Sequence, residues 1–126
     1  MATSTAGAHT VLAAVTADDL WLGIALEVGA SLSTVTQADA TYLGTPRVLI
    51  PGGSGWQAPA GRHVVAAAGT DHGQALQDFT PEWIVWWTAP AGGSPLFARR
   101  VTDTSVGVGD AVLVPASTIR LSYHGF

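Results

Sequence analysis

The chain has 126 residues, of which 48% are hydrophobic and 11% are charged, with a formal net charge of −4 at pH 7 and no cysteine. This length corresponds to one domain, and the lack of cysteine excludes disulfides, thiolate metal sites and thiol nucleophiles. So low a share of charged residues predicts that part of the surface is covered, either by a membrane or by an assembly.

Assembly is favoured over a membrane by the lengths of the apolar runs. A spanning helix needs about 20 consecutive apolar residues, and the best run, residues 20–26, ends at Glu27. Residues 1–15 contain no basic residue and so lack the start of a signal peptide. The only adjacent basic residues are Arg99 and Arg100, too few to neutralise several phosphates. We therefore expect neither a membrane nor a nucleic-acid partner.

The N-terminal segment is small and polar over residues 1–10, which predicts a flexible arm ahead of a single β-sandwich domain at 11–126. A short helix is expected next, because Val11, Leu12 and Val15 share one face at helical spacing. Residues 16–19 are a second possible helix start, with a threonine cap followed by two acids.

Residues 20–28 are predicted to form a strand. A helix here would be apolar on all sides and would carry Gly23 in its interior, which is unfavourable, although the sequence leaves both possibilities open. In a strand the side chains alternate, and one face would carry Leu20, Leu22, Ile24, Leu26 and Val28.

The rest of the chain is predicted to form short strands between glycine and proline breakers. Extended segments are expected at 41–50, 63–68, 82–88, 96–102, 111–114 and 118–124, with loops or turns at 51–55, 69–73, 91–95 and 107–110. This spacing indicates a mainly β fold, an antiparallel sandwich of jelly-roll or immunoglobulin type, rather than a parallel α/β fold.

The sequence offers weak signals of catalysis. Asp71 and His72 stand side by side between glycines, but neighbours in sequence do not face each other as a base and its orienting group must, so a turn is favoured. The glycine-rich loop 51–55 lacks the Lys-Ser/Thr ending of a phosphate cradle. Ser54 lies between two glycines without the rest of a nucleophile elbow. We expect no enzyme.

No metal or cofactor site is expected either. The histidines have no spacing typical of a metal site, because no two of them are four residues apart. They are His9, His63, His72 and His124.

The strongest signal is aromatic. In the strand 82–88, Ile84 and Trp86 would face one side, and Trp83, Val85 and Trp87 the other. A strand that is apolar on both faces is covered on both, so one face meets the core. The second face would meet a loop, the N-terminal helix or another subunit. Tryptophans also stack on sugars, so a carbohydrate site is the alternative.

The order of these features resembles the small virion proteins of tailed phages of actinobacteria, of the minor capsid, head-decoration or tail-fibre-like kind. The resemblance rests on a Trp-containing strand at 20–26, a Tyr-containing segment at 40–43, the Trp-rich strand, a Gly-Gly hairpin at 91–98 and a Gly-Asp turn at 106–111 ahead of the last strand. Residues 27–30 depart from the pattern expected of relatives.

The resemblance implies a non-enzymatic virion protein, first of all a capsid decoration protein that binds the major capsid protein on the outside of the head and is assembled in the host cytoplasm. A homo-oligomer, in particular a trimer, would follow. A minor tail or tail-fibre protein is the second possibility, and a carbohydrate-binding module the third. The expected contact residues are Trp83, Trp86, Trp87, Arg99 and Arg100, the arginines toward an acidic partner surface.

Overall fold

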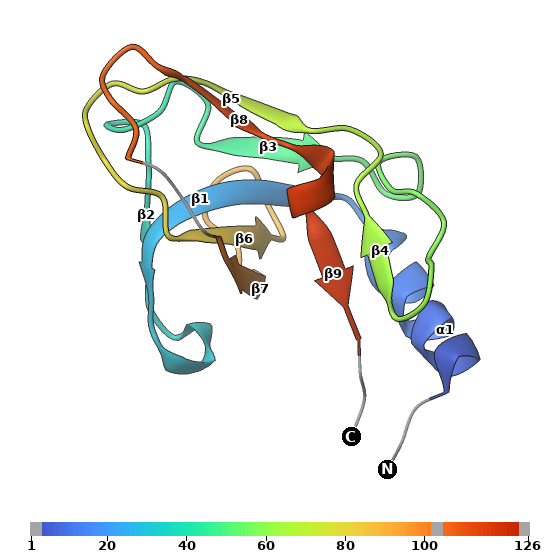
Figure 1. Cartoon of the computed structure of the whole chain (residues 1–126). Helices are drawn as coiled ribbons and strands as arrows, with labels where there is room; N and C mark the ends of the chain where they lie inside the picture. The colour runs from blue at the N-terminus through green and yellow to red at the C-terminus, as the bar shows by residue number, and fades with distance from the viewer. Residues whose placement is uncertain (1–3, 102–104, 124–126) are drawn as a thin grey trace.

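A computed structural model describes residues 4–101 and 105–123 of the chain. The fold is mainly β, with antiparallel strands and a short N-terminal helix, which confirms the predicted fold class (Figure 1). The elements in chain order are α1 (Thr5–Thr16), β1 (Leu20–Val28), the 3-10 turn η1 (Ala30–Leu32), β2 (Val35–Gln37), β3 (Arg47–Ile50), β4 (His63–Val65), β5 (Thr70–Gln74), β6 (Trp83–Trp87), β7 (Pro95–Arg100), β8 (Ala111–Val114), the 3-10 turn η2 (Ala116–Thr118) and β9 (Arg120–Ser122).

Strand β1 organises the larger sheet. One side of β1 pairs first with β3 and then with β2, and its other side pairs with β6, which pairs in turn with β7. Two smaller antiparallel pairs, β4–β9 and β5–β8, form separate sheets. Apolar side chains of both pairs pack on one face of the larger sheet, so the arrangement is sandwich-like.

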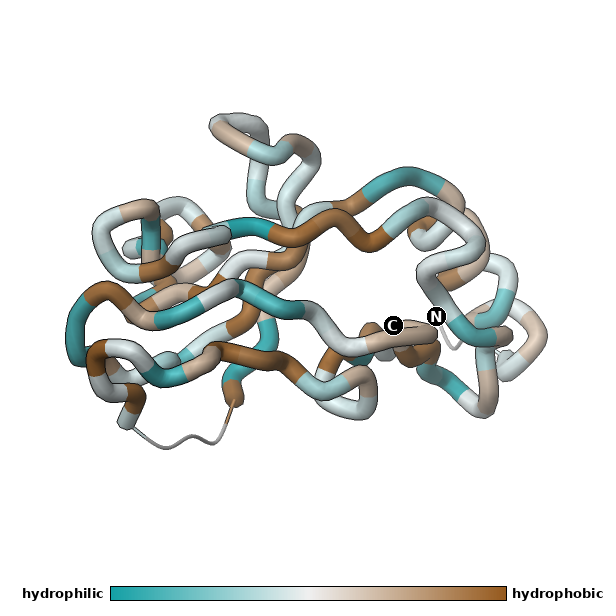
Figure 2. Tube along the Cα trace, turned by 90° about the horizontal axis from the view of Figure 1, so that it is seen from above, coloured by the Kyte–Doolittle hydropathy of each residue, from teal (hydrophilic) through white to brown (hydrophobic). Residues whose placement is uncertain are grey.

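The main core fills the space between these layers. It combines alternate residues of β1 and β6 with residues of the smaller sheets and of α1, as the two-residue period of strands requires. Figure 2 shows hydrophobic stretches recurring along the strands, separated by hydrophilic or neutral loops. The main contributors are Leu12, Leu20, Leu22, Ile24, Val64, Ile84, Trp86, Val112, Ile119 and Leu121.

Helix α1 begins earlier than the sequence indicates. The Ser4 hydroxyl accepts a hydrogen bond from the Gly7 amide at 3.0 Å and caps the helix. Residues 5–10 of the expected arm are therefore helical, and Ala8 is fully buried. The expected helical face at residues 11–15 lies inside this helix, with Leu12 in the core.

The proposed helix start at residues 16–19 is wrong, because α1 ends there. The Thr16 hydroxyl donates to the Leu12 carbonyl at 2.8 Å, and the Thr16 carbonyl accepts from the Gly53 amide at 2.8 Å. Asp19 does cap an amide, but it belongs to the neighbouring loop: its Oδ1 accepts from Gly52 at 2.8 Å. The polar residues of this segment therefore end helix α1 and hold loop 51–55 against it.

Residues 20–28 form strand β1, which confirms the predicted strand, but its alternation breaks near the end. Ala25 is opposite Gln37 and Glu27 is opposite Thr36, so β1 has one extra residue at this point, a β-bulge. Because of the bulge, Val28 packs with the second, smaller apolar cluster on the opposite face from Leu20. The prediction that Val28 shares the face of Leu20 is therefore wrong.

Candidate functional site

Strand β6 presents apolar side chains on both faces, as predicted. Ile84 and Trp86 belong to the main core, and Trp86 is 1% exposed. Val85 and Trp87 belong to a second cluster on the other face, and Trp83 is half-buried beside them. Helix α1 packs against β4, so among the possible covers the helix is not the one that meets this second face.

The second face is a continuous surface of the five strands β2, β3, β1, β6 and β7, which we call the outer aromatic face. Its residues form three rows across the sheet, each row made of direct cross-strand neighbours. The rows are Leu49, Trp21, Trp87 and Pro95; Arg47, Gly23, Val85 and Ala98; and Gln37, Ala25, Trp83 and Arg100.

An arginine stacks on the most buried tryptophan of this face. The Arg47 guanidinium lies 3.7 Å from the centroid of the Trp87 ring, a cation–π geometry. Its Nε and Nη2 donate to the Gln37 side-chain oxygen at 3.1 and 2.9 Å, and its Nη1 donates to the carbonyls of Ala89 and Gly92 at 2.8 Å each. Burial lowers the pKa of Arg47 from its ordinary value, yet an arginine remains charged. This network fixes the hairpin between β6 and β7 against the sheet.

The Trp87 indole fits because its cross-strand neighbourhood contains a glycine. A Cβ atom at Gly23 would lie 3.2 Å from the Trp87 Nε1, tighter than an ordinary contact. Within the described residues that Nε1 has no hydrogen-bond partner. Gly23 thus has a packing role in strand β1 that its helix-breaking tendency alone does not explain.

A second, more exposed arginine contacts Trp83. The Arg100 guanidinium lies 5.7 Å from the Trp83 ring centroid, and its Nη2 is 3.0 Å from a Glu82 carboxylate oxygen. Arg99 is on the opposite side of β7, where its Nη1 donates to the Thr118 carbonyl at 2.8 Å. Of the two adjacent arginines, Arg100 therefore pairs with an acid of this chain, and the structure does not bring the two arginines onto one surface.

A shallow pocket borders Trp83 at the end of the outer aromatic face. Its volume is ≈ 420 Å³, and its other wall is the turn η1 with the residues that precede it. Within η1, Ser31 and Leu32 have φ values of 61° and 58°, a left-handed conformation that is strained for residues other than glycine. The lining residues are Val28, Gly29, Ala30, Ser31, Leu32, Trp83 and Ala98.

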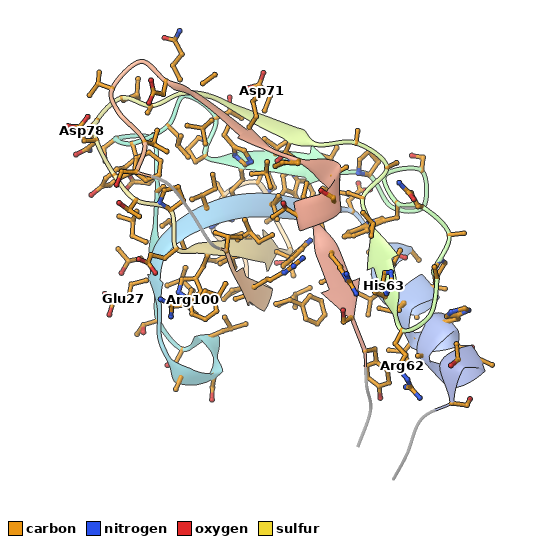
Figure 3. The ribbon with its side chains drawn as sticks, viewed as in Figure 1. Glu27, Arg62, His63, Asp71, Asp78 and Arg100 are labelled. Atoms are coloured by element: carbon orange, nitrogen blue, oxygen red, sulfur yellow. The ribbon has the colours of Figure 1, made fainter. Side chains whose placement is uncertain are left out.

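The Asp71–His72 segment is a strand rather than the expected turn. It lies in β5 and pairs with β8, where Asp71 is exposed and His72 is fully buried on the opposite face. The turn residues produce a bulge in this strand, in which Asp71 Oδ1 accepts from the Gly73 amide at 2.9 Å. In Figure 3 Asp71 projects from β5 away from the larger sheet. The two side chains therefore do not form a catalytic pair.

His72 is held by neutral hydrogen bonds. Its Nε2 is 2.8 Å from the Thr70 hydroxyl and its Nδ1 is 3.1 Å from the Thr45 carbonyl, so both ring nitrogens have partners. The carbonyl contact requires a proton on Nδ1, and Nε2 then accepts from the hydroxyl. Burial lowers the pKa of His72 below its ordinary value. The residue belongs to the core of the second layer.

The other histidines lie apart from one another. His9 Nε2 is 2.6 Å from the Gly61 carbonyl, and His63 Nδ1 accepts from Arg120 at 3.2 Å. His63 lies on β4 near the helix end of the molecule, far from Asp71 (Figure 3), and His124 lies outside the described residues. Over residues 4–101 and 105–123, no three His, Asp or Glu side chains gather in a way that could hold a metal ion.

The sequence interpretation missed Arg47 and several exposed apolar residues. Arg47 is a single charged residue in an otherwise apolar predicted strand. This pattern alone does not show whether the guanidinium is buried or stacked, because that depends on neighbours from other strands. The exposed large hydrophobic residues are Leu49, Leu76, Leu96, Phe97, Val108 and Leu113. Within the described ranges no helix is long and apolar enough to cross a bilayer.

A comparison with models of known protein families and with curated protein sequences found no match to this chain.

Proposed function

We propose that the chain is a non-enzymatic virion structural protein of a tailed phage, a capsid decoration protein that binds the outside of the head through its outer aromatic face. The observation that carries the proposal is a sheet face with three tryptophans and an exposed leucine. When one face of an antiparallel sheet is in contact with water, that face normally carries polar side chains. Aromatic residues and arginine are enriched at protein interfaces. The resemblance of the sequence to small phage virion proteins supplies the kind of partner.

The energetics agree with a docking role for this face. Leu49 is 43% exposed, and Trp21 and Trp83 are half-buried, so further apolar area can still be removed from water. Burial of apolar surface contributes about 25 cal/mol per Å² before the costs of association. The Arg47 guanidinium stacks on the Trp87 ring and holds it in place, and a ring already held loses less entropy on docking.

A carbohydrate-binding module has less support from the same residues. Sugar stacking needs an open ring face, but Trp86 lies in the core and Trp87 is covered by Arg47. Trp83 beside the η1 pocket is the one residue of the three that retains partial exposure.

The proposal is tested by adding purified protein to heads of the phage that encodes it, after removal of the native copies, and measuring co-sedimentation. Leu49→Glu places a carboxylate on the outer aromatic face, and Leu113→Glu places one on the outside of β8, where Leu113 is 62% exposed. We expect Leu49→Glu to lower binding at least about tenfold, since a buried unpaired charge is costly, and Leu113→Glu to bind like the wild type.

Circular dichroism and urea unfolding would confirm that both variants fold. Electron microscopy with an antibody label gives the location: label on tails would replace the decoration role by a tail role. Equal binding of the two glutamate variants would exclude the outer aromatic face as the docking surface. No association with any particle, together with tryptophan quenching by a glycan, would favour the carbohydrate reading instead.

A further inference from the structure

The sandwich is open on one side, between β7 and β9. Within the described residues β7 pairs only with β6, and β9 pairs only with β4. Figure 1 shows β7 and β9 next to each other with no strand between them. Both strands line one groove of ≈ 400 Å³, formed by Trp86, Phe97, Ala98, Arg99, Arg120, Leu121 and Ser122.

The backbone of β7 presents free hydrogen-bonding groups to this groove. The Val101 amide donates to the Glu82 carbonyl at 3.0 Å, which makes these two residues a hydrogen-bonded pair of the antiparallel ladder. Because such pairs alternate, the amides and carbonyls of Phe97 and Arg99 turn toward β6, and those of Ala98 and Arg100 turn toward the open edge.

The same reasoning applies to β9. The Tyr123 amide donates to the Arg62 carbonyl at 2.9 Å, and the Ala66 amide donates to the Ile119 carbonyl at 2.9 Å. The alternation then directs the backbone of Leu121 toward β4, and the backbones of Arg120 and Ser122 toward the groove. Two strand edges without a pairing partner among the described residues therefore form its walls.

The side chains of the groove also lack partners that a further strand would supply. Phe97 lies on the same side of β7 as the core residue Trp86, its cross-strand neighbour, and is nevertheless 36% exposed. Trp86 is 1% exposed and lines the groove, yet its Nε1 has no hydrogen-bond partner within the described residues. A buried indole N–H without an acceptor is unusual and is satisfied when a carbonyl or carboxylate comes within reach.

The charges of the groove define the occupant. Among the described residues, Arg99 and Arg120 line the groove, no acidic residue does, and neither arginine forms an ion pair with a carboxylate. Their polar partners are the Thr118 carbonyl and the His63 ring. Two copies joined through β7 would bring Arg99 and Arg100 of both chains together, and charged edge residues of this kind oppose self-pairing.

We propose that this groove binds an extended, acidic peptide segment of a partner protein, which adds as a strand to the free edge of β7. Main-chain hydrogen bonds to Ala98 and Arg100 hold the strand, its apolar side chains cover Phe97, and its carboxylates meet Arg99 and Arg120. This site uses the backbone edge of β7 and the side chains on its other face, so it shares only the main chain of Ala98 and Arg100 with the outer aromatic face. It does not depend on the proposed virion role.

The test uses two blocked synthetic peptides, Ac-Val-Thr-Glu-Thr-Val-Thr-Glu-NH2 and its counterpart with lysine in place of glutamate, titrated into the 15N-labelled chain. In an extended peptide of this pattern the valines and the glutamates share one face, as Phe97 and Arg99 do on β7. We expect the acidic peptide to bind at least about tenfold more tightly than the lysine peptide, with the largest amide shifts at Ala98, Arg100, Arg120 and Ser122. Two further versions of the acidic peptide carry N-methyl groups on alternate backbone nitrogens, one on the odd-numbered and the other on the even-numbered residues. Each version can form strand hydrogen bonds along only one of its two edges. At least one of the two should therefore lose binding.

Matched variants distinguish the contribution of the groove arginines to peptide binding from a general effect of the substitutions on folding. Arg99→Gln combined with Arg120→Gln should weaken the acidic peptide about tenfold. Leu113→Glu, which adds a negative charge on the exposed side of β8, should leave the affinity within about twofold. Ala98→Pro removes an edge donor and should also weaken binding.

Several results would overturn the proposal: equal affinity for the acidic and lysine peptides, full binding by both methylated peptides, or amide shifts confined to strands β1, β2, β3 and β6 of the outer aromatic face. Concentration-dependent shifts of the β7 amides without peptide would mean that a second copy occupies the groove. The Leu49→Glu variant should bind the peptide normally, so a failure of the decoration role and a failure of this site are distinguishable.

Discussion

The guanidinium of Arg47 lies 3.7 Å from the centre of the Trp87 ring and joins β3 to a segment far away in the sequence, strand β6 with the hairpin that follows it. It stacks on the indole and at the same time donates to the side chain of Gln37 and to two hairpin carbonyls. One half-buried cation thereby connects the sheet to the loop at its end.

Replacement of Arg47 by alanine should lower the free energy of unfolding by about 3 kcal/mol, since it removes a desolvated cation–π contact and hydrogen bonds from a charged donor. Arg47→Lys should recover less than half of this loss, because an ammonium cannot make the forked contacts. Urea unfolding measures both.

The control for this variant is Arg100→Ala, which removes a tryptophan contact and an ion pair at an exposed site. It should cost at most ~1 kcal/mol. Equal losses for the two arginines would contradict the structural role assigned to Arg47.

Gly52 has a backbone contact that no other residue can keep. A Cβ atom there would lie 2.2 Å from the Ala17 carbonyl oxygen, and neither partner is a flexible side chain. We expect Gly52→Ala to lower the free energy of unfolding by about 2 kcal/mol or more, because the end of α1 must shift away from loop 51–55. Gly44→Ala is the matched control: no atom lies within 4 Å of its added Cβ, so it should be neutral or slightly stabilising in thermal unfolding.

Stability should fall on mild acidification because of His72. Burial lowers its pKa in the folded chain, so the unfolded chain takes up the proton first as the pH falls below about 6.5. The stabilisation is complete above that pH and is lost between it and the lower folded pKa. Urea midpoints at pH 7.5 and 5.0 should differ in wild type and should differ less in His72→Gln. A midpoint difference that the substitution leaves unchanged would assign the effect to another group.

Helix α1 should respond to charge on one face only. Ala8→Glu buries a carboxylate where Ala8 is 0% exposed, and we expect a loss of about 2–3 kcal/mol or an undocked helix. Ala6→Glu makes the same change at an exposed position in the first turn, where an acid is favourable to the helix dipole, so its thermal midpoint should stay the same or rise. Similar effects of the two would mean that the helix does not dock through Ala8.

Residue patterning predicted the strands with the clearest periodicity. In β6 the alternation of apolar residues assigned Trp86 to one face and Trp87 to the other, and both assignments are confirmed. In β1 the same rule failed at Val28, because a bulge depends on how β2 pairs with β1 and leaves no mark in the alternation itself. The segment around His72 misled for a related reason: its turn residues form a bulge within a paired strand.

The sequence by itself determined the mainly β fold, the two-faced strand β6 and the excess of apolar over charged residues, because periodicity and composition are local quantities. Only the tertiary structure decided that Arg47 stacks on Trp87, that His72 is buried with both nitrogens bonded, and that Arg99 and Arg100 act on opposite sides of β7. It also decided where the sandwich stays open. Each of these depends on which strands become neighbours, and pairing between distant segments is set by the packing of the whole chain.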